Sequence, residues 1–294
     1  MINEEMNVIE KIHPDFFIVG APRSGTTSLH EYLNEIPEIF MCPKESGYFS
    51  KFSIGRLASE EEYKKSFVDA TPNQLIGEST AVYLRDPETP DKIHQANHNA
   101  KIIIMLRDPI ERAFSHYLMN VRNEYETQSF SKKLELYDKN QPHGKFHDYI
   151  IMPSYYFDSV SKYIDVFGRE QVKICIYEEF ADKTHKIVSE ILDFLCIDSS
   201  LPKNIAEKYN DFAHPPSKSQ KFIMTNYIAQ NIGKRLLSKS TRLSIKNFLS
   251  DKNSKPKLEE NDILKLYEFF INDVTKIQDL LQRKLHWQHF SNTF

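Results

Sequence analysis

A glycine-bounded turn between two predicted elements carries the residues with the clearest chemistry. Gly20–Gly25 follows a short apolar run, Phe16–Val19, and precedes a segment, Ser28–Ile36, whose apolar residues recur at helical spacing. In a strand, loop and helix arranged in this way, the loop amides and the positive end of the helix dipole point at the same place. The sequence therefore predicts a binding site for a phosphate-like anion around residues 20–28.

The side chains in this loop distinguish it from the usual ATP- or GTP-binding loop, G-x-x-x-x-G-K-[ST]. Gly20, Gly25 and Thr27 match that pattern, but Thr26 stands at the lysine position and Arg23 is the only cation in the loop. The lysine that reaches the far phosphates of a nucleoside triphosphate is missing. We therefore expect the anion to be held by Arg23, the threonine hydroxyls and the backbone. A purely structural turn and a degraded nucleotide-kinase loop are the alternatives.

A second candidate anion ligand follows the most apolar predicted strand, residues 101–106. Arg107 comes directly after this strand, and Asp108 and Pro109 then supply an N-cap and a proline at the first helical position. Ligands of open α/β sheets bind beyond the carboxyl ends of the strands. An arginine at such a position is also compatible with a capping or surface role. We favour an anion ligand, with Ser115 about two turns along the helix.

Predicted strands alternate with predicted helices along the chain. The strands are expected at 16–19, 75–77, 101–106 and 172–177, and the helices at 28–36, 59–68, 109–122, 153–167, 183–195 and 259–287. This alternation predicts an α/β fold of three layers, with a mostly parallel central sheet, a P-loop-like binding loop and helices on both faces. Residues 40–52 are expected to form a loop, and residues 124–151 an irregular excursion.

Composition and charge exclude several classes of protein. The chain has 294 residues and a net charge of −3, which is not the footprint of a nucleic-acid binder. Three widely spaced cysteines (Cys42, Cys175 and Cys196) lack metal-site spacing and suit a reduced intracellular setting. The N-terminus lacks the apolar core of a signal peptide, and no segment approaches the ~20 apolar residues of a membrane span. We therefore expect a cytoplasmic protein with no metal.

Charge is unevenly distributed along the chain. The segment His214–Lys257 holds eight lysines and two arginines against one acid, Asp251, which is a local balance of +9. Because the whole chain is at −3, the remainder is at −12 (−3 minus 9). Such asymmetry predicts an anionic ligand or partner on one face, although most of these side chains are expected to be a solvated helix surface.

Four segments, in order, resemble motifs of the sulfotransferases that use 3'-phosphoadenosine-5'-phosphosulfate (PAPS), in particular bacterial and heparan-sulfate-type members. Residues 17–29 (FIVGAPRSGTTSL) are similar to the 5'-phosphosulfate loop, and residues 43–49 (PKESGYF) to the segment with the catalytic glutamate. Residues 101–117 (KIIIMLRDPIERAFSHY) are similar to the 3'-phosphate motif, and residues 176–180 (IYEEF) to the tyrosine-glutamate strand end. The similarity spans roughly residues 15–198.

This resemblance implies a single sulfotransferase domain over residues 1–294, with a core at about 13–200 and a basic helical part at about 201–294. It also implies PAPS as the donor, without a metal. The implied donor-binding residues are Arg23, Ser24, Gly25, Thr26, Thr27, Ser28, Arg107, Ser115, Tyr177 and Lys218. The implied catalytic residues are Glu45 as general base, Arg23, Lys44 near the leaving group, and His214 as the next candidate base.

The chain departs from the family pattern in three places. Arg23 stands where many members have lysine, and residues 154–156 (SYY) stand where G-x-Y is usual. The lysine-glycine loop that closes over the donor in the heparan enzymes has no clear copy, and Lys218 and Lys221 are its candidate substitutes. We expect the stretch from His214 to Lys218, beside a Pro-Pro turn, to approach the donor or the acceptor.

Two alternative functions fit part of the sequence. A P-loop nucleotide or small-molecule kinase is disfavoured by Thr26 at the lysine position and by the lack of an aspartate directly after a strand. A non-catalytic anion-binding protein is disfavoured by Glu45 in the predicted active site. For a sulfotransferase, the acceptor is expected to be a hydroxyl or amine of a small molecule or carbohydrate, and sugars, phenols and natural-product alcohols fit equally well.

Overall fold

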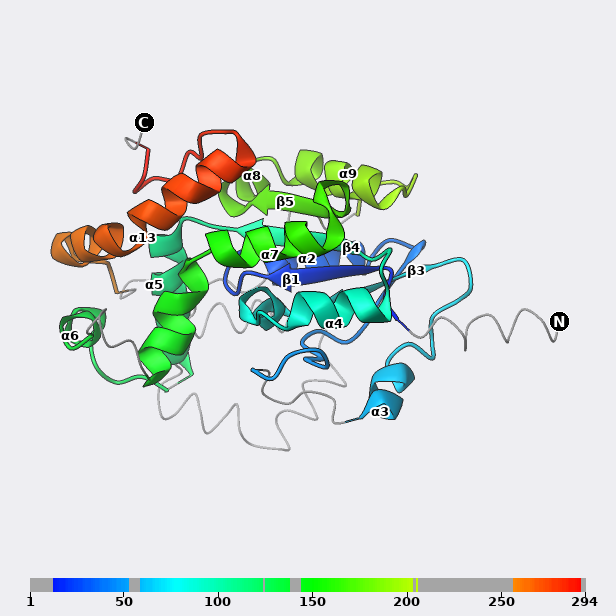
Figure 1. Cartoon of the computed structure of the whole chain (residues 1–294), viewed down its shortest axis with the longest axis horizontal. Helices are drawn as coiled ribbons and strands as arrows, with labels where there is room; N and C mark the ends of the chain where they lie inside the picture. Colours follow the sequence, from blue (N-terminus) through cyan, green and yellow to red (C-terminus); the bar gives the residue numbers. More distant parts are fainter. Residues whose placement is uncertain are drawn as a thin grey trace, which may run out of the picture.

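The core of the protein is a five-stranded, wholly parallel sheet with the strand order β2-β3-β1-β4-β5 (Figure 1). The computed structural model describes residues 13–52, 59–123, 125–137, 144–202, 205 and 256–291. The strands are β1 (Phe16–Gly20), β2 (Ile39–Met41), β3 (Leu75–Ser79), β4 (Lys101–Leu106) and β5 (Val172–Ile176). The predicted α/β fold with a parallel central sheet is confirmed.

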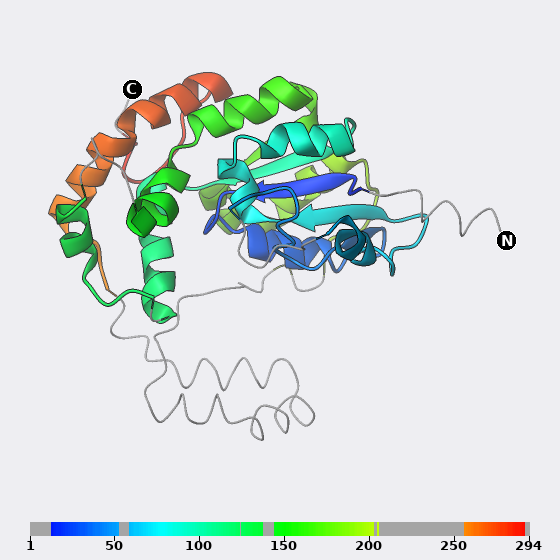
Figure 2. The ribbon, with the colours of Figure 1, turned by 60° about the horizontal axis from the view of Figure 1, so that its bottom comes forward.

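Helices cover both faces of this sheet because alternate residues of each strand point to opposite sides. Phe16 and Ile18 of β1 belong to a cluster with Leu29 and Leu33 of α2 (Thr26–Leu33), while Phe17 belongs to the other cluster. Figure 2 shows α2 below the sheet and α4 and α7 above it. The strands are buried on both faces, as their nearly continuous apolar sequences require.

The remaining helices and short helical turns follow the chain. They are α3 (Glu60–Lys65), η1 (Ala81–Arg85), α4 (Thr89–Ala96), α5 (Pro109–Arg122), α6 (Phe130–Glu135), η2 (Phe146–Ile151), η3 (Met152–Ser154), α7 (Phe157–Phe167), η4 (Arg169–Gln171), α8 (Tyr177–Asp182), α9 (Thr184–Leu195) and α13 (Glu260–Leu281). None of these helices is long and apolar enough to cross a bilayer.

Local capping signals place several helix ends where the sequence predicts them. The Ser59 hydroxyl accepts a hydrogen bond from the Glu62 N–H at 3.2 Å and begins α3. Asp108 caps α5, with Pro109 at its first position. Helix α7 ends at Gly168, whose φ of 80° suits a residue without a side chain.

Three predictions about the elements are wrong. Residues 39–41, which overlap the start of the loop predicted at 40–52, form β2, which pairs with β3 and is too short to show a periodic pattern. The predicted excursion at 124–151 contains α6 and η2, because Ser129 caps α6 and its Phe130 is buried against aromatic neighbours. The predicted helix at 259–287 ends at Leu281. Residues 206–255, which include most of the basic segment His214–Lys257, lie outside the described residues, so the single-domain division stays a prediction.

Candidate donor and active site

The carboxyl ends of the strands bring the predicted ligands to one edge of the sheet. The backbone N–H of Ala21, directly after β1, donates to the Met105 carbonyl of β4 at 2.7 Å. At the next pair of strands, Leu106 of β4 lies opposite Ile176 of β5. Because the strands are parallel, the segments that follow them leave the sheet on the same side. In Figure 2 the dark-blue arrow of β1 points toward the side occupied by α5 and α13.

Two hydrogen bonds join the anion loop to the strand-end motif. The Arg23 Nε donates to the Ser115 Oγ of α5 at 3.2 Å, and the Arg107 guanidinium donates to the Arg23 carbonyl at 3.2 Å. Arg23 has a φ of 71° and Gly25 a φ of 88°, so the loop turns through the left-handed region at both residues. The structure therefore brings together three of the predicted anion ligands (Arg23, Arg107 and Ser115).

Tyr177, the first residue of α8, packs against both motifs. The Arg107 guanidinium lies 4.7 Å from the centroid of the Tyr177 ring, which is cation–π geometry. A Cβ at Gly25 would lie 2.9 Å from a carbon of the same ring, so this glycine permits the close approach. Arg107 also pairs with Glu111, one turn along α5, at 3.2 Å. Tyr177 thus holds the loop and the Arg107 side chain on one surface.

Positive charge around the loop is poorly compensated. Burial, followed by the nearby Arg122 and Arg107, lowers the pKa of Arg23 to about 10. Within the described residues, neither Arg23 nor the fully buried Arg112 has a carboxylate within ion-pair distance. Arg112 instead donates to the Ser154 hydroxyl at 2.6 Å and to the Ile150 carbonyl. An anion bound here would relieve the repulsion between these guanidinium groups.

Two of the buried polar atoms without a hydrogen-bond partner among the described residues belong to this site. The Ser24 hydroxyl, in the loop, and the Arg107 Nε are both buried without a hydrogen-bond partner within the described part of the chain. Leaving a buried donor unpaired costs ~1–3 kcal/mol, and a bound anion would supply the missing partner for these two atoms. Thr26 and Thr27 are the first residues of α2. The backbone N–H groups in the first turn of a helix have no partner within the helix and are available to an anion. A phosphate or sulfate group suits these donors.

Glu45, in the segment after β2, lies at the carboxyl end of β3, the strand next to β1. Its carboxylate accepts a hydrogen bond from the Ala81 N–H at 3.1 Å, and its own N–H donates to the Ser79 carbonyl at 2.8 Å. A Cβ at Gly20 would lie only 2.6 Å from the Ala81 carbonyl oxygen. Ala81 therefore touches both the Glu45 carboxylate and the start of the anion loop. Lys44 pairs with Glu45 at 2.5 Å.

The Glu45 side chain is accessible to solvent. It is 44% exposed, compared with 19% for Lys44. The φ of Glu45 is 64°, a left-handed conformation that is uncommon for a residue with a side chain. Backbone strain of this kind costs ~1–3 kcal/mol and concentrates at functional sites.

A buried carboxylate, Glu78, was not predicted from the sequence. It is fully buried at the end of β3 and accepts hydrogen bonds from the Tyr83 hydroxyl at 2.6 Å, the Thr80 hydroxyl at 3.0 Å, and Ser46 and Tyr63. Burial raises the pKa of Glu78, against the effect of these four hydrogen bonds. Since Ser46 follows Glu45 directly, this network anchors the loop that carries the predicted base.

Arg112 was also missed, although it lies inside the quoted 3'-phosphate motif, five positions after Arg107. His214, Lys218 and Lys221 lie outside the described residues, so their predicted roles stay predictions. Among the residues that the structure does describe, no group of three or more His, Cys, Asp or Glu side chains has the arrangement of a metal site.

The fold and this site define the class as an α/β protein with a parallel sheet and a candidate site for a phosphate- or sulfate-like group at the carboxyl edge of that sheet. A family model described as "Sulfotransferase domain" matches residues 13–279, and the chain therefore belongs to the sulfotransferase family. The donor of this family is PAPS, and the resemblance predicted from the four motifs is confirmed.

Individual relatives agree with this assignment. The crystal structure of a sulfotransferase from Alicyclobacillus acidocaldarius is similar to this chain with a TM-score of 0.69 and 29% identity, over 93% of this chain and 97% of that chain. "Membrane-associated sulfotransferase kil1" of Dictyostelium discoideum is 22% identical over 74% of this chain. Mouse "Heparan sulfate glucosamine 3-O-sulfotransferase 5" is 30% identical over 35% of this chain. The chain spans 63% and 30%, respectively, of the lengths of these two curated relatives.

Proposed function

We propose that this protein transfers the sulfuryl group of PAPS to a hydroxyl or amine of a small-molecule or carbohydrate acceptor, with Glu45 as the general base. The observation that carries this proposal is the joining of the two anion-binding motifs by the hydrogen bonds of Arg23 to Ser115 and of Arg107 to Arg23. A donor with phosphate at both its 5' and 3' positions needs two such anion sites on one surface.

The donor would lie along this surface. The 5'-phosphosulfate would take the loop amides, Arg23 and the hydroxyls of residues 24 and 26–28. The 3'-phosphate would take Arg107 and Ser115, with Tyr177 beside them. The unpaired Ser24 hydroxyl and Arg107 Nε are available for this purpose. Recognition of the 3'-phosphate is what would distinguish PAPS from ATP.

The chemical step is an in-line displacement at sulfur. The bond between sulfur and the bridging oxygen of the 5'-phosphate breaks, a bond from the acceptor oxygen or nitrogen to sulfur forms, and 3',5'-ADP leaves. Sulfuryl transfer resembles phosphoryl transfer, in which positioning and electrostatics do most of the work. Arg23 would stabilise the negative charge that grows on the bridging oxygen.

Glu45 would take the acceptor proton. Its exposed carboxylate lies next to the loop and is held by the Ala81 N–H, so one oxygen is oriented while the other pairs with Lys44. A general base of this kind contributes ~10²–10⁴-fold to the rate. The ion pair between Lys44 and Glu45 would break when the acceptor binds to Glu45. The Lys44 ammonium would then lie near the departing 5'-phosphate.

The test is a mass-detected assay of sulfuryl transfer from PAPS to a panel of sugars, phenols and alcohols. Glu45→Gln keeps the shape of the side chain but cannot accept the proton, so turnover should fall by ~10²-fold or more while 3',5'-ADP affinity is unchanged. Glu61→Gln, in the exposed salt bridge of α3, is the matched control and should retain full activity. Near-normal turnover of Glu45→Gln would place the base elsewhere, and His214 is then the next residue to substitute.

The kinase alternative predicts a different ligand. Thermal shifts measured with 3',5'-ADP and with ATP and magnesium separate the two functions, because Arg107 and Ser115 have no 3'-phosphate to bind in ATP. The cytoplasmic location stays a prediction, since the Dictyostelium relative is described as membrane-associated. Fractionation of cells that express the full chain would test it.

A further inference from the structure

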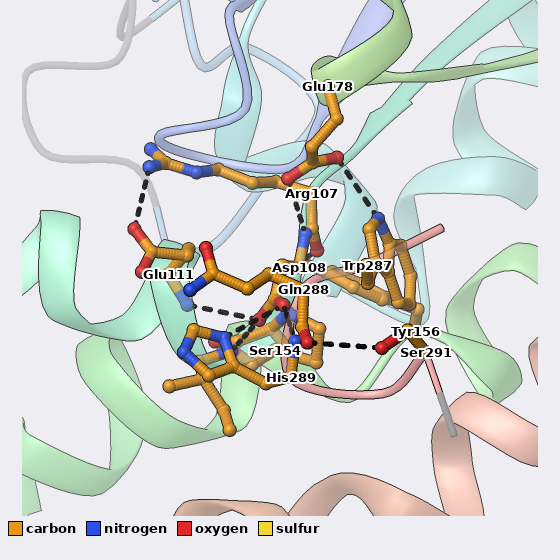
Figure 3. Close-up of polar contacts among 12 residues, drawn as sticks. Arg107, Asp108, Glu111, Ser154, Tyr156, Glu178, Trp287, Gln288, His289 and Ser291 are labelled. Carbon is orange, nitrogen blue, oxygen red and sulfur yellow. Dashed lines mark hydrogen bonds and ion pairs between the residues drawn. The ribbon is translucent and has the colours of Figure 1, made fainter. Parts of the chain in front are cut away.

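The segment that follows α13 packs against the end of β4, where Arg107 lies. We call residues 285–291 the C-terminal strap. Its three large apolar side chains, Leu285, Trp287 and Phe290, are at most 1% exposed, so the strap is anchored in the core. Figure 3 shows its Trp287 and His289 pointing at the turn between β4 and α5.

Hydrogen bonds join the strap to this turn at two points. The Trp287 indole donates to one oxygen of Glu178 at 3.0 Å, and the other Glu178 oxygen accepts from the Asp108 N–H at 3.1 Å. The His289 N–H and its Nδ1 lie 3.1 and 3.0 Å from the same Asp108 oxygen, Oδ2 (Figure 3). Two residues of the strap therefore bind to Asp108: His289 binds it directly, and Trp287 binds it through Glu178.

Asp108 is the residue through which the strap acts on the candidate donor site. Its other oxygen, Oδ1, caps α5 by accepting from the N–H groups of Ile110 and Glu111 at 2.9 and 3.2 Å. The carbonyl of the preceding residue, Arg107, accepts from the Tyr156 hydroxyl at 2.8 Å. The Arg107 backbone is thus held on one side by Tyr156 and on the other by Asp108.

We propose that His289 is a positioning residue for recognition of the 3'-phosphate, which it supports by holding Asp108 and hence the backbone that carries Arg107. This inference rests on the proposed function, in which Arg107 binds that phosphate. A purely structural tail would stabilise the fold without affecting one ligand more than another. His289 would act on the 3'-phosphate selectively, because it is linked to the site through the residue next to Arg107.

The surroundings of His289 make this support dependent on pH. Burial by itself lowers the pKa of His289, but the hydrogen bond and charge of Asp108, with Glu111 nearby, raise it above the ordinary 6.5. The charged groups that act on His289 are Asp108, which contacts it, and Glu111 of α5. Arg107 in turn pairs with Glu111, and Glu178 of α8 accepts from the Asp108 N–H. Because the folded-state pKa is raised, the extra stabilisation is present below pH 6.5 and is lost as the pH rises through the folded-state value.

The experiment compares the affinities of 3',5'-ADP and 5'-AMP for the full chain by calorimetry at pH 6 and pH 8. His289→Ala should weaken 3',5'-ADP binding at pH 6 by about tenfold, the effect of one charged hydrogen bond, and 5'-AMP binding by less than about twofold. His289→Asn keeps a donor for Asp108 without the charge. At pH 6 it should bind 3',5'-ADP with an affinity between those of His289→Ala and the wild type. At pH 8 its 3',5'-ADP affinity should approach that of the wild type.

The control is His286→Ala, an exposed position in the same strap, which should bind both ligands like the wild type. Equal losses for the two ligands in His289→Ala, or no loss for either, would overturn the proposal. If His289→Ala does not fold, the pH dependence of His289→Asn decides by itself. Arg107→Ala separates a failure of this inference from a failure of the proposed function. If Arg107→Ala weakens 3',5'-ADP binding more than 5'-AMP binding and His289→Ala does not, the proposed role of His289 is wrong and that of Arg107 stands.

Discussion

The Arg23 Nε lies 3.2 Å from the Ser115 hydroxyl oxygen, although the two residues are 92 positions apart in the chain. This hydrogen bond joins the glycine loop after β1 to the second turn of α5. The two motifs are recognisable separately in the sequence, and the fold joins them into one candidate anion-binding surface. Each part of that surface can be tested separately by substitution.

Arg107→Ala should weaken binding of 3',5'-ADP far more than binding of 5'-AMP. A charged hydrogen bond contributes ~1.5–3 kcal/mol, which corresponds to a loss of roughly 10- to 100-fold. Arg107→Lys should recover part of the affinity, because lysine keeps the charge but not the planar fork. Calorimetry with both ligands measures the effect, with the exposed Lys186→Ala as control. Equal losses for both ligands would mean that Arg107 does not bind the 3'-phosphate.

Arg23→Ala should lose donor affinity and turnover together, because Arg23 would hold the bound anion as well as the transition state. Ser115→Ala removes a hydroxyl that orients Arg23 and that would also bind the 3'-phosphate, so it should weaken 3',5'-ADP binding but reduce turnover less than Arg23→Ala does. Steady-state kinetics with PAPS, together with direct 3',5'-ADP binding, separate the two effects. An Arg23→Ala variant with unchanged 3',5'-ADP affinity would contradict the placement of the 5'-phosphosulfate at this loop.

Gly25→Ala should lower the free energy of unfolding by ~1–3 kcal/mol and weaken donor binding. The φ of 88° disfavours any side chain, and the new Cβ would lie 2.9 Å from the Tyr177 ring. Urea titration measures the stability, and 3',5'-ADP binding measures the loop. Gly144→Ala is a matched control for the strain alone, because Gly144 has a φ of 81° but no neighbour within 4 Å. If the two variants behave alike, contact with Tyr177 does not constrain the loop.

Glu78→Gln should flatten the dependence of stability on pH. The folded-state pKa of Glu78 is raised by burial above the ordinary 4.5, so between these two values the folded protein keeps a proton that the unfolded chain has lost. The wild type therefore loses stability as the pH rises through this window, by ~1.4 kcal/mol for each tenfold difference in proton affinity between the folded and unfolded chains. Glutamine stays neutral and removes this contribution. The measurement is the free energy of unfolding of both proteins from pH 4.5 upward, and parallel curves would contradict a raised pKa.

Local signals in the sequence determined much of the fold and the anion-binding character predicted for the loop at residues 20–25. The run of Phe16–Val19, the glycines that bound the next turn, and the Asp108-Pro109 cap each act within a few residues, so neighbouring side chains carry the information. The position of Arg107 directly after a buried strand also predicted where it would lie, because parallel strands end on the same side of the sheet.

Only the tertiary structure decided how distant groups combine. The three residues of β2 become a strand through pairing with β3, and Glu78 is a hydrogen-bonded core carboxylate only because Ser46 and Tyr63 fold over it. The contact of His289 with Asp108 spans 181 positions. Burial, charge repulsion and hydrogen bonding at these sites depend on which surfaces meet, and that is set by the packing of the whole chain rather than by any short pattern within it.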